Sequence, residues 1–289
     1  MKALIVKPVP VPSTGHPNAP HPSLMNHEFT CGLIAPKGAG KTTVICNLLK
    51  FYKGFFHNIL VFSPTIDSDE KWDWIKNQKL LIENKPLKAW IRRMGEKREV
   101  ESVVEQAKPD QCLDGLVNPD GGFDGKIPEE HFFDDYDDDT FRNIMDEQMK
   151  LIKLLKKHGK TKHLANRILV IFDDLVGSAL FNGKRGSYFK GVNTRHRHYS
   201  ASFLMVSQGY KEIPKTIRTN FTGLICFFIG NEKEVDVIYE EFPMGLKKDD
   251  WLELYQYATE GDHSFLYINF QKAKNMRLMK NFSEFLFVK

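Results

Sequence analysis

Residues 29–52 read FTCGLIAPKGAGKTTVICNLLKFY, and the order of features in this stretch decides the fold. An apolar run at 29–34 predicts a buried strand, a loop with two glycines follows, and a helix is predicted from Lys41 onward. Such a loop wraps backbone N–H groups around phosphates, while the positive end of the helix faces the same oxygens. Gly38 and Gly40 allow the positive φ angles and the close backbone approach that this requires. The stretch therefore predicts a strand–loop–helix cradle for a nucleoside triphosphate.

Each position of this predicted P-loop has an expected role. Lys41 would reach the β- and γ-phosphates, and the hydroxyl of Thr42 would hold Mg²⁺. The pattern G-x-x-x-x-G-K-[ST] is broken at its first position by Ala35, which affects only the start of the loop. The alternative is a glycine-rich turn that binds nothing, and the flanking strand and helix weigh against it. The residues expected to contact ATP are Pro36, Lys37, Gly38, Ala39, Gly40, Lys41, Thr42 and Thr43.

The length exceeds that of the usual single domain but is compatible with one large, decorated α/β domain. The chain has 289 residues, of which 42% are hydrophobic, enough for a sizeable core. Its four cysteines form no CxxC pair, so they indicate neither a zinc site nor a disulfide framework, and a reducing compartment fits best. No run of about 18 apolar residues occurs, so we expect neither secretion nor a membrane-spanning segment.

Charge is unevenly distributed, although the net charge is only +4. Residues 129–147 hold nine acids and one arginine, whereas residues 150–167 hold seven lysines or arginines and no acid. Such blocks are most often a solvated loop and a solvated helix face. Two further interpretations stay open: a basic surface that faces DNA, or a contact between unlike charges of neighbouring subunits.

Other apolar runs predict the remaining strands. Residues 58–63, 167–172, 202–207 and 223–229 are rich in β-branched and aromatic side chains, as expected of strands covered on both faces. Their separations leave room for helices, which indicates an α/β fold with a central, mostly parallel sheet. A closing strand and a basic tail are expected in residues 264–289.

The segments between these strands complete the predicted organisation. Residues 1–27 are proline-rich and are expected to be an extended arm without a core of its own, either loose or wrapped around a neighbouring subunit. Residues 28–289 form the nucleotide-binding domain, with a helical and acidic insertion at about 67–165. Within the insertion we expect a helical, amphipathic stretch at about 67–108, an irregular stretch at 109–139 and a long helix at 140–158.

Two acids follow the strand at 167–172, at the carboxyl end where open α/β sheets bind their ligands. Asp173 is expected to orient Mg²⁺ through water, which is the Walker B role. Asp174 is expected to polarise the attacking water, as an acid at this position does in additional-strand ATPases. Glutamate is the more usual residue there, and the shorter aspartate implies either that the water lies nearer or that hydrolysis is slow. The alternative is a pair of acids that caps the next helix.

Gln208 ends the strand predicted at 202–207. If this strand lies between the P-loop strand and the Walker B strand, the side chain would touch the γ-phosphate or the attacking water; otherwise it is an ordinary loop residue. The basic segment 194–220 contains Arg197 and Arg218. Either arginine could reach a neighbouring subunit's site and neutralise the charge that develops on the γ-phosphate. Histidines alternate with arginines in this segment, which disfavours a metal site.

The motifs APKGAGKT, NILVFSPT, ILVIFDDL, RHYSASFLMVSQ and IPKTIRTNFTGLICFF together resemble the poxvirus-type genome-packaging ATPases of large eukaryotic DNA viruses and virophages, within the HerA/FtsK superfamily. The resemblance covers about residues 28–270 and implies a RecA-like P-loop NTPase of the additional-strand type. By this resemblance Arg197 and His198 correspond to the family's Arg-His pair, Gln208 to its polar sensor and Arg218 to its later arginine.

The resemblance implies a motor that uses ATP and Mg²⁺ to translocate viral double-stranded DNA into a preformed capsid. It implies a homo-oligomeric ring, pentameric or hexameric, with capsid or vertex proteins as partners, at the viral assembly site in the host-cell cytoplasm and in association with the capsid. DNA binding is expected to be independent of sequence and sensitive to salt. Lys184, Arg185 and Lys190 are candidate channel-lining residues, with an exposed basic loop as the alternative.

Two other functions stay open on the sequence. A P-loop nucleotide kinase would need an arginine-rich lid and an acceptor pocket; the sensor-bearing strand and the Ile-Arg-x-Asn element at 217–220 weigh against it. A structural protein that locks a capsid vertex with bound ATP and hardly hydrolyses it is kept open by Asp174. Stimulation of ATP turnover by DNA distinguishes the motor from both.

Overall fold

A computed structural model describes residues 15–95, 123–175, 177–182, 188–242 and 244–287. Within these residues one mostly parallel sheet is formed by the strands β1 (Thr30–Ile34), β2 (Asn58–Phe62), β3 (Phe132–Phe133), β4 (Ile168–Asp173), β5 (Ala201–Ser207), β6 (Gly223–Phe227), β7 (Phe265–Asn269), β8 (Leu278–Lys280) and β9 (Glu284–Phe285). Their spatial order is β3-β2-β4-β5-β1-β6-β7-β8-β9. The predicted α/β fold with a central, mostly parallel sheet is confirmed.

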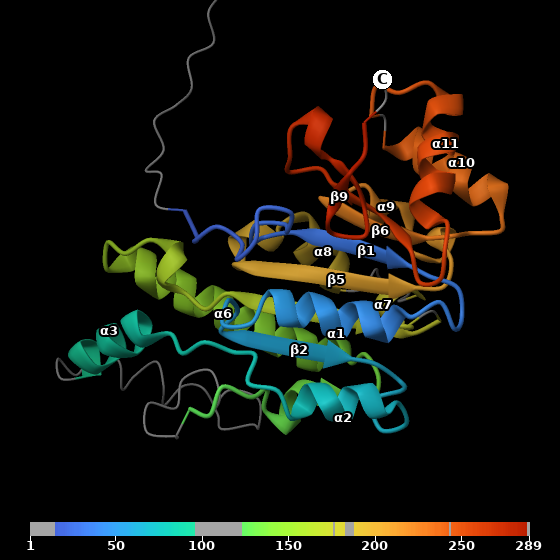
Figure 1. The fold of residues 1–289 in the computed structure, drawn as a ribbon. Helices are drawn as coiled ribbons and strands as arrows, with labels where there is room; N and C mark the ends of the chain where they lie inside the picture. The colour runs from blue at the N-terminus through green and yellow to red at the C-terminus, as the bar shows by residue number, and fades with distance from the viewer. Residues whose placement is uncertain (1–14, 96–122, 176, 183–187, 243, 288–289) are drawn as a thin grey trace, which may run out of the picture.

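Helices cover both faces of this sheet (Figure 1). Successive residues of a strand point to opposite faces, so the buried runs supply two apolar layers. On one face Leu169 and Ile171 of β4 share a core with Ile45 of α1; on the other, Phe172 packs with Phe141 of α6. The helices are α1 (Lys41–Phe51), α2 (Glu70–Lys76), α3 (Lys85–Gly95), α6 (Asp138–Lys157), α7 (Ala179–Asn182), α8 (Tyr188–Thr194), α9 (Lys215–Arg218), α10 (Glu232–Glu241) and α11 (Lys248–Thr259).

The central strands β2, β4, β5, β1 and β6 run parallel, so their carboxyl ends meet at one edge of the sheet. β5 lies between β4 and β1, so the condition under which Gln208 would reach the site is met. In register, Ile34 at the end of β1 is opposite Ser207, and Asp173 at the end of β4 is opposite Val206. The segments that follow these three strands are therefore neighbours at the carboxyl edge.

The C-terminal part extends the sheet with antiparallel strands. β7 pairs with β6, β8 with β7 and β9 with β8, all antiparallel. The predicted closing strand is therefore present as β7, but what was expected to be a basic tail forms two further short strands. The two outermost strands of the described sheet, β3 and β9, are each two residues long.

The segment at 67–165 differs from its prediction in two ways. The helical stretch expected at about 67–108 contains α2 and α3, but residues 77–84 interrupt it, and residues 96–108 lie outside the described part. Pro86 lies in the first turn of α3, a position that suits proline at a helix start and that the periodicity argument overlooked. The segment is also an integral part of the domain, because β3 extends the sheet and α6 covers one of its faces. The expected long helix at 140–158 is confirmed as α6.

Residues 15–27 pack onto the domain, so the predicted boundary at 27/28 falls inside a packed segment. Leu24 and Met25 are buried, and the Tyr52 hydroxyl donates a hydrogen bond to the Met25 carbonyl at 2.5 Å. The Asn269 amide donates to the Ser23 carbonyl at 3.1 Å. A Cβ atom on Gly223 would lie 2.2 Å from Met25 Sδ, so the close approach of this segment requires glycine there. Residues 1–14 of the predicted arm lie outside the described residues.

Candidate nucleotide site

The predicted P-loop connects β1 to α1 at the carboxyl edge. Gly38 and Gly40 have φ angles of 81° and 105°, in the left-handed region that glycine adopts without strain. Gly40 is the N-cap of α1; no side chain caps this helix, and its first turn contains no acid. The N–H groups of the first turn are therefore left without side-chain partners, as a phosphate-binding helix N-terminus needs.

Ala35 fits the loop because its position does not need glycine. Its φ angle is not positive, and its side chain is buried in the core on the α1 face. Its backbone N–H donates to the Ser207 carbonyl at 3.1 Å, as a continuation of the β1–β5 pairing. The departure from the glycine pattern therefore changes neither the conformation nor the hydrogen bonding of the loop.

Asp173 is the last residue of β4 and is 4% exposed. Ser63, directly after β2, donates a hydrogen bond from Oγ to Asp173 Oδ2 at 2.9 Å, whereas Oδ1 has no partner among the described residues. Burial raises the pKa of Asp173 to about 6, and the Ser63 hydrogen bond and the Lys41 charge oppose that rise. A buried carboxylate oxygen without a partner suits a hard cation, which prefers oxygen ligands.

Asp174 meets two other predicted site residues. The ammonium group of Lys41, the first residue of α1, lies 3.4 Å from Asp174 Oδ2. The Gln208 amide donates to Oδ2 at 2.9 Å and to Oδ1 at 3.2 Å. Asp174 has a φ angle of 53°, an uncommon conformation that aspartate tolerates better than most residues and that is found often at functional sites. The first residue of α1 and the residues directly after β4 and β5 thus converge at the carboxyl edge, beside the predicted P-loop.

Neither predicted arginine lies in this cluster. Arg197 is exposed in the 3-10 helix His196–His198, which precedes β5 and therefore lies at the amino edge, across the sheet from the P-loop. Arg218 is buried on α9, where its guanidinium donates to Glu241 at 2.7 and 3.1 Å and to the Ile213 carbonyl at 2.8 Å. Because these contacts occupy the Arg218 side chain inside its own protomer, the geometry does not support the prediction that it reaches another subunit's site.

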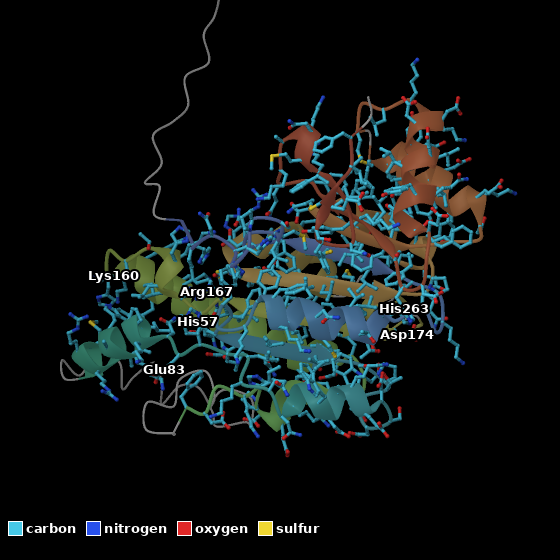
Figure 2. The ribbon with its side chains drawn as sticks, viewed as in Figure 1. His57, Glu83, Lys160, Arg167, Asp174 and His263 are labelled. Atoms are coloured by element: carbon cyan, nitrogen blue, oxygen red, sulfur yellow. The ribbon has the colours of Figure 1, made fainter. Side chains whose placement is uncertain are left out.

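Sequence reasoning missed two contacts at the site. Ser63, the partner of Asp173, follows an apolar strand, and a polar residue at that position is a signal that could have been used. His263, in the turn between α11 and β7, has its Nδ1 atom 3.0 Å from the Ala39 carbonyl of the P-loop. Figure 2 shows His263 and Asp174 at the same end of the molecule. Because 224 residues separate His263 from Ala39, no local pattern indicates this contact.

The other candidates lie elsewhere. Lys184 and Arg185, predicted to line a channel, fall outside the described residues, and Lys190 is half-buried on α8. A cavity of about 650 Å³ opens between α2 and residues 124–129, but none of the residues that line it belongs to the P-loop or to the acidic pair. Among the residues that the structure describes, no helix is both long and apolar enough to cross a membrane.

Sequence comparison finds one family and one similar protein. The family described as "Poxvirus A32 protein" matches residues 121–267, about half of the chain and downstream of the P-loop. The uncharacterized protein 075L of Invertebrate iridescent virus 6 is 26% identical over 137 residues, which are 47% of this chain and 49% of that protein. The match thus spans about half the length of this curated relative.

Structural comparison finds several solved ATPases with low sequence identity. The genome packaging NTPase B204 of Sulfolobus turreted icosahedral virus 2, in complex with ATP-gammaS, has a TM-score of 0.47 at 13% identity and covers 86% of this chain and 95% of its own. EssC (ATPases 2 and 3) from Geobacillus thermodenitrificans has a TM-score of 0.49 at 10% identity, covering 88% and 39%.

Proposed function

Because the chain belongs to the poxvirus A32 protein family, we propose that it is an ATP-hydrolysing motor that translocates viral double-stranded DNA into a preformed capsid. The observation that carries the proposal is the convergence of Lys41, Asp174 and Gln208 beside the buried Asp173 at the carboxyl edge. Such an edge is where α/β sheets bind nucleotides. We propose ATP and Mg²⁺ as its ligands.

The P-loop residues bind the triphosphate through backbone N–H groups and Lys41. Asp173 Oδ1 and the hydroxyl of Thr42, the second residue of α1, would hold Mg²⁺. When bound, Mg²⁺ offsets the negative charge on the β- and γ-phosphates. The pairing of Lys41 with Asp174 at 3.4 Å implies an exchange of partners, because a γ-phosphate attracts the ammonium group away from the carboxylate.

Once Lys41 has moved to the phosphates, the Asp174 carboxylate is free to accept a proton from the attacking water. Gln208 holds that carboxylate through its amide and so fixes the direction of its free lone pairs. In phosphoryl transfer, most of the catalysis comes from positioning the reacting groups and from electrostatic stabilisation, rather than from covalent chemistry. Asp174 is therefore the proposed base, and Gln208 its proposed positioning and sensing residue.

A head-to-tail ring would complete the site. Arg197 is exposed at the amino edge and cannot reach the P-loop of its own protomer, which lies across the sheet. In a heterologous ring one surface of each copy meets a different surface of the next. We propose that Arg197 is the arginine supplied to the site of the neighbouring subunit. The proposed partners are the other subunits of the ring and capsid or vertex proteins. The proposed location is the viral assembly site in the host-cell cytoplasm.

Steady-state ATP hydrolysis, measured with and without long double-stranded DNA across a salt series, tests the proposal. A motor that grips phosphates is expected to be stimulated by DNA, and the stimulation should fade as salt rises. Binding of ATP without turnover, indifferent to DNA, would contradict the proposal and point to a nucleotide-locked structural protein. Turnover that needs a small phosphoryl acceptor would point to a kinase.

A further inference from the structure

The charge on the exposed face of α6 changes from negative to positive along the helix. The acids of this helix lie in its first half, while Lys153, Lys156 and Lys157 lie in its last turns. Lys160 follows directly, after Gly159 ends the helix with a φ angle of 68°. All four lysines are exposed, on the side away from the buried Ile152 and Leu155. We call Lys153, Lys156, Lys157 and Lys160 the lysine stripe.

As far as the described residues show, the lysine stripe has no counter-charge. None of its four ammonium groups forms an ion pair within 4 Å there, and three acids of the described structure pair with other lysines. Glu28 pairs with Lys162, Glu83 with Lys88 and Glu147 with Lys150. The positive charge of the stripe is therefore available to an anionic partner.

A neighbouring element adds further cations close to the end of the stripe. The Lys162 ammonium group donates to the Arg197 carbonyl and so joins the end of α6 to the 3-10 helix before β5. The exposed arginines of this segment are Arg195 and Arg197. α3 packs against the other, apolar side of α6, with Leu87 and Trp90 in one cluster with Ile152 and Leu155.

Helix electrostatics explain only part of this arrangement. Cations in the last turn of a helix interact favourably with its dipole, which accounts for lysines at the end of α6 in any solvated helix. That effect does not account for the exposed Arg195 and Arg197 before β5, which belong to another element and which the Lys162 hydrogen bond joins to the end of α6. The cations of two separate elements are therefore close together at this end of the molecule, and an anionic partner would offset their mutual repulsion.

We propose that the lysine stripe is the surface through which this protein contacts the phosphate backbone of double-stranded DNA; the inference rests on the proposed function and assigns its DNA-binding surface. Lysines three and four residues apart on a helix are about 5–6 Å apart at Cβ, and their long side chains adapt to the closely spaced phosphates of a duplex. Ammonium groups hold phosphates without reading bases, as sequence-independent transport needs.

The composition of this surface favours a duplex over a single strand. Proteins that hold single strands combine cations with exposed aromatic rings on which bases stack. Among the described residues, the large aromatic side chains that are exposed lie outside α6, α3 and the segment before β5. The stripe thus offers charge without a stacking platform. Figure 2 places Lys160 at the opposite end of the molecule from Asp174 and His263, so the stripe is separate from the nucleotide site.

The test compares two quadruple alanine variants of the full chain that lose the same charge. One replaces the stripe (Lys153→Ala, Lys156→Ala, Lys157→Ala and Lys160→Ala). The control replaces four exposed lysines that lie elsewhere and form no ion pair in the described structure (Lys53→Ala, Lys79→Ala, Lys233→Ala and Lys274→Ala). Affinity for a random-sequence duplex is measured against salt concentration, alongside thermal melting, DNA-independent ATP hydrolysis and sedimentation velocity.

The slope of log affinity against log salt falls by about 0.9 for each phosphate contact that is lost. We expect the stripe variant to lose about three to four units of slope, to bind duplex at least tenfold more weakly, and to keep its DNA-independent hydrolysis. The control is expected to keep the wild-type slope. An equal loss in both variants would reduce the effect to net charge and overturn the inference.

Other outcomes separate this inference from the proposed function. If the wild-type protein binds DNA and the stripe variant binds with the same slope, the stripe is not the DNA surface, although the motor function stands. If the stripe variant loses self-association while its DNA slope is unchanged, the stripe is a subunit contact, and the inference is overturned. If the wild-type protein fails to bind duplex DNA even at low salt, the proposed function fails first.

Discussion

At the scale of single residues, Asp173 and Asp174 are adjacent in the chain but have different surroundings. Asp173 is buried, with Ser63 as its hydrogen-bond partner and one oxygen without any. Asp174 is partly exposed and shared between Lys41 and Gln208. Asp173 therefore suits metal binding, because it has a buried oxygen without a described partner. Asp174 suits water activation, because its carboxylate is accessible and held by the Gln208 amide.

Replacing Asp173 by asparagine should stabilise the nucleotide-free protein at pH 7 while it abolishes Mg²⁺-dependent hydrolysis. Burial raises the pKa of Asp173 to about 6, from an ordinary value of 3.8. The folded state therefore binds more protons than the unfolded state between these pH values, and it loses stability as pH rises through about 6. Asparagine removes that cost, so the free energy of unfolding should rise by about 1–3 kcal/mol.

Denaturant unfolding of both proteins at pH 7 and pH 4 measures this effect. The gain from Asp173→Asn should shrink toward pH 4, where the wild-type carboxyl is protonated in the folded state. A variant that is less stable than wild type at pH 7 would contradict the assigned environment of Asp173. The raised pKa of Asp173 also affects hydrolysis. At limiting Mg²⁺, the rate of hydrolysis should decline below about pH 6, because protonation of Asp173 removes a metal ligand.

Lys41→Ala and Asp174→Ala should fail at different steps. Loss of Lys41 removes the phosphate contact, so ATP binding should be lost. Loss of Asp174 should leave binding intact and lower kcat by about 10²–10⁴-fold, the range of a general base. Equilibrium binding of a fluorescent ATP analogue, alongside single-turnover hydrolysis, separates the two. Asp174→Asn serves as the control, because alanine at a φ angle of 53° is strained whereas asparagine tolerates this conformation. Normal turnover in both variants would rule out Asp174 as the base.

At the scale of elements, the turn between α11 and β7 supports the P-loop from the far end of the chain. The P-loop peptide accepts a hydrogen bond from His263 through the Ala39 carbonyl at 3.0 Å, and a Cβ on Gly40 would lie 3.2 Å from the same ring nitrogen. The antiparallel extension of the sheet therefore has a direct contact with the nucleotide site. A contact of this type positions the loop without touching the phosphates.

His263→Ala should raise the KM for ATP about three- to tenfold, the equivalent of one neutral hydrogen bond, with kcat within twofold of wild type. Because His263 has a φ angle of 60°, the control is His263→Asn, which tolerates that conformation and retains an N–H donor. Steady-state kinetics should show that asparagine recovers most of the lost affinity. A fall in kcat at unchanged KM would show instead that His263 acts in the chemical step.

At the scale of the whole molecule, the two edges of the sheet have different tasks. The carboxyl edge contains the proposed nucleotide site, and the amino edge presents Arg197 and the lysine stripe. A protomer therefore cannot complete its own site with Arg197. The proposed ring resolves this, because it brings the amino edge of one copy toward the carboxyl edge of the next.

Mixing two kinds of inactive subunit tests whether Arg197 acts in the site of a neighbouring subunit. Arg197→Ala subunits retain an intact P-loop, and Lys41→Ala subunits retain Arg197, so mixed rings should recover part of the hydrolysis that both lack alone. Arg218→Ala should give no such rescue, because it breaks a buried pair with Glu241 and should lower the free energy of unfolding by about 3–5 kcal/mol. Absence of rescue by Arg197→Ala, with assembly verified by sedimentation, would count against a shared site.

The central strands and the nucleotide cluster could be predicted from sequence because each leaves a local signal. Buried parallel strands read as continuous apolar runs, and the P-loop, Asp173, Asp174 and Gln208 follow such runs directly. Contacts between distant segments leave no local signal. The pairing of Arg218 with Glu241 and the contact of His263 with Ala39 join residues that only the folded topology brings together. A two-residue strand such as β3 is too short for a periodicity to appear.

The two-residue strands at the edges of the sheet also bear on how copies of this protein can meet. An edge strand exposes unpaired N–H and C=O groups, and a long one invites another chain to add a strand. As far as the described residues extend, β3 and β9 offer only short stretches for such addition. Short edge strands therefore disfavour the addition of strand to strand that would build fibrous aggregates, even where many copies are concentrated. Self-association is then expected to use side-chain contacts, and such contacts can close a ring of limited size.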